Sequence, residues 1–133
     1  MGLLDDQTFP AEWERCRPYL ESALHRGGDL LTIEDVRERV ETGLYEFWPG
    51  PDSALVTQVI PGSGGRAELN ILLGGGNMET LREMVPCIEA FAREIGVSLI
   101  TVLGRTGWSR SFLTKEMGYR PVAVLLGKEL KGG

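Results

Sequence analysis

The segment best equipped for chemistry is a glycine-rich run that joins an apolar stretch to an amphipathic one. It consists of Leu72, Leu73, Gly74, Gly75, Gly76, Asn77 and Met78. Glycines let the backbone approach a ligand closely and adopt positive φ angles. Asn77 can cap a following helix, and the free amides and positive dipole of a helix start bind anions. The run therefore predicts a phosphate cradle, although a glycine-rich turn that only ends a strand would read the same way.

Two common phosphate ligands fit this run poorly. No lysine follows the glycines as it does in a P-loop, which counts against a nucleoside triphosphate. The strands expected before the run form a meander rather than the start of a parallel sheet, which counts against a dinucleotide. Arg105 and Arg110 could bind phosphate in a bidentate manner or simply face water. Trp108, which lies between them, could stack on a planar group such as an adenine or pack at the edge of the core.

Bulk composition excludes several classes of protein. The chain has 133 residues, of which 42% are hydrophobic and 25% charged, which is typical of a globular domain. A net charge of −5 argues against nucleic acid as a partner. A single histidine, His25, and two distant cysteines, Cys16 and Cys87, predict reduced thiols and no metal site. The first residues do not resemble a secretory signal, and no apolar stretch approaches the ~20 residues of a membrane span. We expect a cytoplasmic protein without a membrane partner.

The elements that must position these residues follow from periodicity and turn signals. Helices are expected over 9–25, kinked or split into two pieces at Pro18, and from a Thr32 cap to Gly43. Three short strands over 44–48, 54–60 and 67–73 should form an antiparallel meander, because their connections are too short for a crossover. A long helix capped by Asn77, a buried strand over 97–103, a helix over 109–117 and a strand over 121–126 should follow. The sequence predicts one α+β domain over 1–133 with a mixed, mostly antiparallel sheet and short flexible ends near 1–8 and 130–133.

This element order, the glycine run and the ending Leu113, Lys115, Gly118 and Tyr119 resemble the GCN5-related N-acetyltransferase (GNAT) family. Gly74 and Gly76 match the two small positions of that family's pyrophosphate loop. The phrase Gly104-Arg105-x-Gly107-Trp108-x-Arg110 is similar to small GNAT-like proteins of tailed bacteriophages and prophages. The resemblance covers roughly residues 12 to 130.

The resemblance implies an acyltransferase that takes acetyl-CoA or CoA as its cofactor and an amine of unknown identity as acceptor. The Leu72–Met78 run would then hold the pyrophosphate, with Arg105 and Arg110 as further candidates. A family β-bulge would splay the strands 67–73 and 97–103, and a backbone amide near Leu72 would polarise the thioester carbonyl. Glu68 would be the base, although a solvated strand residue is the alternative.

Three departures from the family pattern keep a second hypothesis open. Ile71 stands where the loop usually begins with glutamine or arginine, and Thr114 stands where a tyrosine usually protonates the leaving thiolate. The family's first strand has no counterpart before the first expected helix. Tyr119 could supply a phenol instead, or it could pack as the apolar residue after a glycine-ended helix. The alternative is a non-catalytic GNAT-fold protein that assembles with itself or with a virion.

Overall fold

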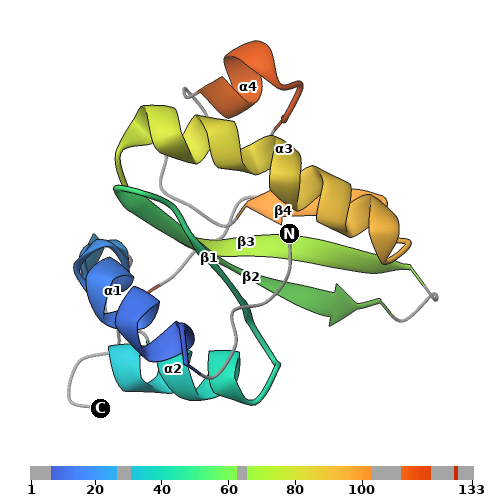
Figure 1. Cartoon of the computed structure of the whole chain (residues 1–133). Coiled ribbons are helices and arrows are strands. Elements are labelled where there is room, and N and C mark those ends of the chain that lie inside the picture. The colour runs from blue at the N-terminus through green and yellow to red at the C-terminus, as the bar shows by residue number, and fades with distance from the viewer. Residues whose placement is uncertain (1–6, 27–30, 63–65, 103–111, 121–127, 129–133) are drawn as a thin grey trace.

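The computed structural model describes residues 7–26, 31–62, 66–102, 112–120 and 128. Two helices come first, followed by three strands and then by a helix, a strand and a short helix (Figure 1). The elements are α1 (Phe9–Arg26), α2 (Ile33–Glu41), β1 (Glu46–Pro49), β2 (Ser53–Pro61), β3 (Ala67–Gly76), α3 (Met78–Glu94), β4 (Leu99–Val102) and α4 (Phe112–Glu116).

The described strands form one mixed sheet in the order β1-β2-β3-β4. The pairs β1–β2 and β2–β3 are antiparallel, so the predicted meander is confirmed. The pair β3–β4 is parallel, and α3 supplies the crossover that such a pair requires. The α+β fold with a mixed, mostly antiparallel sheet flanked by helices is therefore confirmed.

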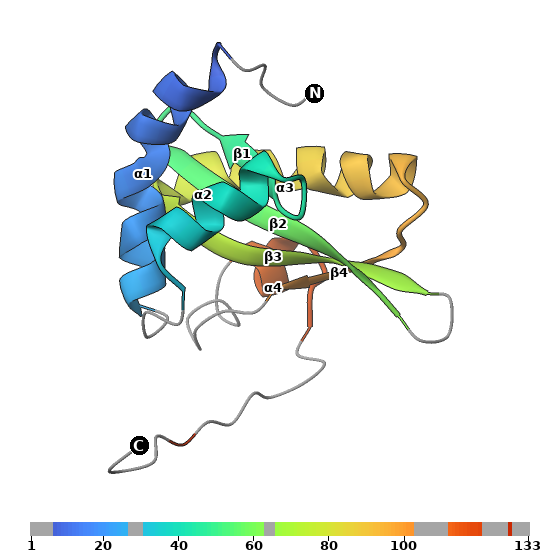
Figure 2. The same cartoon turned by 90° about the horizontal axis from the view of Figure 1, so that it is seen from below.

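Helices cover both faces of the sheet. Figure 2, seen from below, places α1 and α2 in front of the strands and α3 behind them. Each face has its own apolar core because side chains alternate along a strand. The core under α3 contains Leu55, Leu69, Ile71, Leu81, Val85, Ile88 and Leu113, among others. The core under α1 and α2 contains Trp13, Cys16, Leu20, Val36, Phe47, Ala54 and Val56, among others.

The predicted helix boundaries are largely confirmed. Thr32 caps α2 through a capping box with Asp35, whose amide donates to the Thr32 hydroxyl at 3.1 Å. Asn77 caps α3. Gly43, Gly96 and Gly118 each adopt the positive φ angle expected of a residue that ends a helix.

Several expectations are wrong in detail. Helix α1 runs without interruption through Pro18, because apolar side chains on both sides of the proline are buried against the sheet. Strand β1 begins at Glu46, since the amides of Leu44 and Tyr45 both donate to a carbonyl at the end of α2. Strand β4 is half-buried throughout rather than fully buried, because it is the last of the described strands in the sheet. The expected strand over 121–126 lies outside the described residues.

Candidate functional site

A β-bulge interrupts β3 at Leu72. Val56 on β2 pairs with Leu73, whereas the next residue, Thr57, pairs with Ile71, so Leu72 is an extra residue on β3. The extra residue turns two consecutive side chains to one face, and both Leu72 and Leu73 pack against the core under α1 and α2. The family resemblance implies a β-bulge that splays the strands 67–73 and 97–103, and this bulge lies within the first of them.

The described part of the parallel pairing of β3 with β4 reaches this bulge, and the residue that follows β4, at position 103, lies outside the described residues. The register of this pairing runs from Glu68 opposite Leu99 to Ile71 opposite Val102. From Leu72 to Gly76, β3 remains paired with β2 on one side, and no described strand pairs with its other side. That edge carries backbone donors and acceptors in extended conformation, to which an extended ligand can add as a strand.

The glycines do not form the turn that the sequence predicts. Gly74, Gly75 and Gly76 continue β3 and pair with Leu55, Ala54 and Ser53. A Cβ at Gly75 would lie 2.2 Å from the Tyr19 carbonyl oxygen, so this glycine lets α1 rest directly on the sheet. Gly76 has a φ of +106°, and a Cβ there would lie 2.4 Å from the Asp52 carbonyl oxygen. Two of the three glycines thus have a packing reason that the sequence could not reveal.

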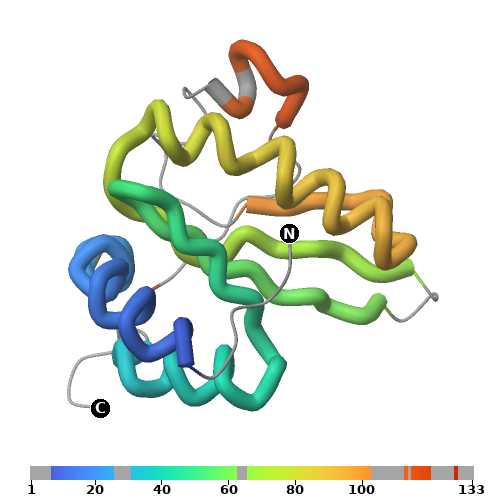
Figure 3. Tube along the Cα trace, in the orientation of Figure 1, coloured from blue at the N-terminus to red at the C-terminus, as the bar shows by residue number. Residues whose placement is uncertain are grey.

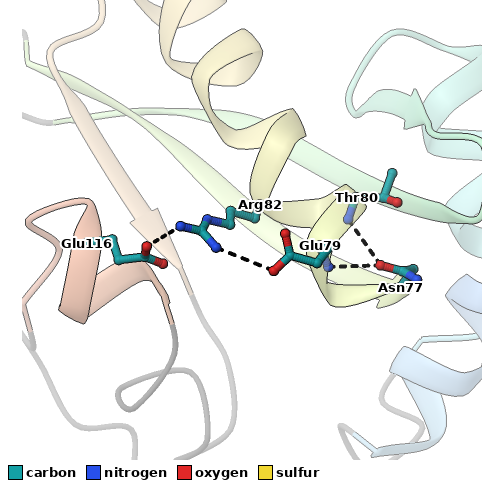
Figure 4. A network of polar contacts seen from close by, with 5 residues as sticks. All are labelled: Asn77, Glu79, Thr80, Arg82 and Glu116. Atoms are coloured by element: carbon teal, nitrogen blue, oxygen red, sulfur yellow. Dashed lines mark hydrogen bonds and ion pairs between the residues drawn. The ribbon is translucent and has the colours of Figure 1, made fainter.

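Helix α3 begins two residues after the last glycine of β3, and the tube in Figure 3 shows the strand leading directly into the helix. The Asn77 side-chain oxygen accepts hydrogen bonds from the amides of Glu79 at 2.9 Å and Thr80 at 3.2 Å (Figure 4). The Asn77 amide donates to the Asp52 carbonyl oxygen at 3.0 Å, and the Thr80 hydroxyl donates to the Asp52 carboxylate at 2.5 Å. Two of the amides at the helix start where the sequence predicts a phosphate cradle are therefore already bonded to the Asn77 side chain. Met78, the first residue of the helix, is exposed.

Two ion pairs that share one arginine connect the first half of α3 to α4. Arg82 pairs with Glu79 one turn earlier, at 3.3 Å, and with Glu116 on α4 (Figure 4). All three side chains are at least partly exposed, so the pairs orient α4 rather than contribute much stability. Thr114 lies within α4, but its side chain is outside the described part of the structure.

Glu68 belongs to a chain of hydrogen bonds on the parallel strands. Leu69 and Ile71 face α3, so Glu68 and Asn70 face the side of α1 and α2. The Thr101 hydroxyl on β4 donates to Glu68 Oε2 at 2.5 Å, and Asn70 Nδ2 donates to the same hydroxyl at 2.9 Å. Asn70 is 8% exposed and Glu68 is half-buried. The carboxylate is thus held in place four residues before the bulge.

The structure does not bring Tyr119 to Glu68. The Tyr119 hydroxyl donates to Glu89 on α3 at 2.8 Å, and its ring packs against the core on the α3 side of the sheet. Burial, reinforced by the hydrogen bond to Glu89, raises the pKa of Tyr119 above its ordinary value. A phenol that already donates to a carboxylate is a poor proton donor, and the packing role suggested by the sequence fits this geometry.

The other candidate residues either lie outside the described part of the chain or do not belong to a catalytic or metal-binding cluster among the described residues. Arg105, Trp108 and Arg110 fall in the undescribed stretch 103–111. Cys16 and Cys87 are unpaired, and burial raises the pKa of Cys16, which makes its thiol a poor nucleophile. Among the described residues, no three His, Cys, Asp or Glu side chains gather as metal ligands, and no helix is long and apolar enough to cross a membrane.

Sequence reasoning missed three residues that the structure places beside the predicted ones. Asn70 could have been found, because it alternates with Leu69 and Ile71 in the same way as Glu68. Thr101 could not, since its position beside Glu68 depends on the register of two strands that are distant in sequence. Asp52 lies in a turn, where aspartate is common for local reasons, so nothing in the sequence indicated its contact with Thr80 on α3.

Solved structures with a similar fold include the following two. An acetyltransferase of Trypanosoma brucei superposes with a TM-score of 0.57 at 15% identity, over 85% of this chain and 94% of its own. A protein of Thermus thermophilus superposes with a TM-score of 0.53 at 16% identity, over 88% of this chain and 97% of its own. The sequence matches no family model, and no curated protein is significantly similar to it. At these identities the likeness establishes the fold alone, an α+β fold shared with an acetyltransferase.

Proposed function

We propose that this protein is an acetyl-CoA-dependent N-acyltransferase of GNAT type. The observation that carries the proposal is the bulge at Leu72 on β3, beside the parallel pair that β3 forms with β4. In this proposal the β3 edge from Leu72 to Gly76, with which no described strand pairs, accepts the amide groups of pantetheine as an added strand. A backbone amide near Leu72 then polarises the thioester carbonyl. Catalysis in this arrangement comes from positioning and from electrostatic stabilisation of the developing oxyanion.

The pyrophosphate end of the cofactor belongs, in this proposal, at the junction from Gly74 to Met78. A helix start stabilises negative charge through its free amides and its dipole. The Asn77 side chain now bonded to two of those amides has to be displaced, or the phosphate has to use the remaining ones. Arg105 and Arg110 are proposed as additional phosphate partners from the stretch that precedes α4.

Glu68 is proposed as the base. The acceptor amine loses a proton to Glu68 while its nitrogen attacks the thioester carbon. The C–S bond then breaks and the CoA thiolate leaves and takes up a proton. Thr114, at the position where the family commonly has a tyrosine, remains a candidate donor of that proton. Tyr119 is a weaker candidate because its hydroxyl already donates to Glu89.

Isothermal titration with acetyl-CoA tests the proposal. We expect saturable binding to the wild-type protein, and absence of binding at millimolar ligand would refute it. Glu68→Gln is the matched variant: it should bind acetyl-CoA as the wild type does and lose transfer to amines by about 10²- to 10⁴-fold, the usual contribution of a general base.

A second candidate function is favoured by the start of α3. Asn77 already accepts from the amides of Glu79 and Thr80, and Asp52 already accepts from the Asn77 amide and the Thr80 hydroxyl, so this helix start is capped without an anion. We therefore keep the proposal of a non-catalytic GNAT-fold protein, with self-assembly or a phage particle as its partner. The phage or prophage setting, in a host cytoplasm or on a virion, is proposed from the sequence resemblance alone. Sedimentation that shows a monomer, together with CoA turnover, would rule out this alternative.

A further inference from the structure

We propose that Thr101 and Asn70 are positioning residues that fix which oxygen of Glu68 receives the acceptor's proton. The inference deepens the proposed function and rests on it, because it assigns a role to two residues through the base. Neither residue is expected to touch the cofactor.

The direction of each hydrogen bond in this chain is determined by the groups that form it. A threonine hydroxyl has a single proton, and the Thr101 hydroxyl lies 2.5 Å from Glu68 Oε2, which can only accept when ionised. Asn70 Nδ2 lies 2.9 Å from the Thr101 hydroxyl oxygen and 3.5 Å from the Thr101 carbonyl oxygen, so its amide donates to that residue. With its lone pair engaged by Asn70, the hydroxyl is held with its proton toward Glu68.

This arrangement makes the two oxygens of the carboxylate unequal. Oε2 accepts from Thr101, whereas Oε1 accepts no hydrogen bond within the described part of the chain. Asn70 is buried and Thr101 lies opposite it in the parallel register, so both are anchored by the sheet rather than by a flexible loop. Oε1 is therefore the oxygen presented to the amine, and its orientation is set before the substrate arrives.

The proton balance is simple. The amine nitrogen forms its bond to the acetyl carbon and gives one proton to Glu68 Oε1, while the C–S bond breaks and its electron pair leaves on sulfur. Thr101 neither gains nor loses a proton during this step, since its hydroxyl proton stays shared with Oε2. Removing the hydroxyl would free the carboxylate to rotate and would slow the transfer without changing cofactor binding.

A second chain of the same kind on the other face of the sheet provides a matched control. Trp48 Nε1 donates to the Thr57 hydroxyl at 2.9 Å, and this hydroxyl donates to Glu46 Oε1 at 2.7 Å. Thr57 is completely buried and faces α3, away from Glu68. Replacing either threonine by valine removes one hydroxyl from a similar chain, but only one of the two chains contains the proposed base.

The experiment compares Thr101→Val, Thr101→Ser and Thr57→Val with the wild type. CoA release from acetyl-CoA is measured by chromatography in the presence of spermidine, glucosamine or a lysine-containing peptide. Chromatography is needed because the exposed thiol of Cys87 would react with a colorimetric thiol reagent. Binding of acetyl-CoA and the thermal midpoint are measured on the same samples.

Thr101→Val should lower kcat by about 10- to 100-fold, the effect of a misplaced catalytic group, and leave the Kd for acetyl-CoA unchanged. Thr101→Ser should recover most of the rate, and Thr57→Val should lose stability but keep its kcat. Equal rates for Thr101→Val and wild type would overturn this inference and leave the proposed function standing. A wild-type protein that binds no acetyl-CoA would instead overturn the proposed function, and this inference with it.

Discussion

Replacing Asn77 by aspartate separates the two roles that the start of α3 can have. Asparagine and aspartate are equally good helix caps, so Asn77→Asp keeps the bonds to the amides of Glu79 and Thr80. The added negative charge also interacts favourably with the helix dipole. The same charge, however, would repel a phosphate bound at this helix start. Asn77→Asp should therefore maintain or raise the stability of the fold and weaken the binding of acetyl-CoA.

The magnitude follows from the geometry of the cap. A phosphate that bonds to neighbouring amides would lie about 5 Å from a carboxylate at position 77. At an effective dielectric constant of roughly 40, two unit charges at that distance repel each other by about 1.7 kcal/mol. Salt lowers this value, so we expect the Kd for acetyl-CoA to rise by about tenfold at physiological ionic strength and by less at high salt. The free energy of unfolding should stay the same or rise by about 0.3–1 kcal/mol.

Titration calorimetry at two salt concentrations and thermal unfolding measure the two effects. Asn77→Ser is the neutral control: it retains a capping oxygen and should bind acetyl-CoA within about threefold of the wild type. If Asn77→Asp and Asn77→Ser bind acetyl-CoA equally well, the phosphate does not lie at the start of α3, and the reasoning about this helix end is refuted.

Three further predictions concern stability and the role of the phenol. Gly75→Ala should lower the free energy of unfolding in urea by several kcal/mol, because the added Cβ would meet the backbone of α1. Gly43→Ala should lower it by only about 1 kcal/mol, because Gly43 has a positive φ but open space around it. Similar losses for the two variants would show that Gly75 is not required for the close approach of α1. Burial raises the pKa of Glu46 above its ordinary 4.5. The protonated carboxyl therefore favours the folded state, and this contribution to stability is lost as the pH rises through the pKa of the folded protein. Glu46→Gln should thus raise the thermal midpoint at pH 7, modestly because the group is partly solvated, and not at pH 4; a gain that is equal at both pH values would contradict this. Tyr119→Phe should cost about 1 kcal/mol by removing the bond to Glu89 and leave kcat within about twofold, and a large fall in kcat would restore the phenol as the acid.

The local elements were predictable from sequence because their signals are local. The Thr32–Asp35 capping box, the Asn77 cap and the glycines that end helices involve residues within a few positions of each other. The meander followed from connections too short for any crossover. The α+β class and the mixed sheet followed from the order of these elements, and the parallel pairing of β3 with β4 was implied by the family resemblance.

The site depended on contacts between residues that are distant in sequence, which local signals do not report. The sequence alone determined that a glycine run would lead from a strand into a capped helix. Only the tertiary structure decided that Gly75 lies under α1, because the reason for that glycine is the carbonyl of Tyr19. The tertiary structure likewise placed Thr101 beside Glu68, and separated Tyr119 from both, because strand register and the face of a sheet are properties of the assembled fold.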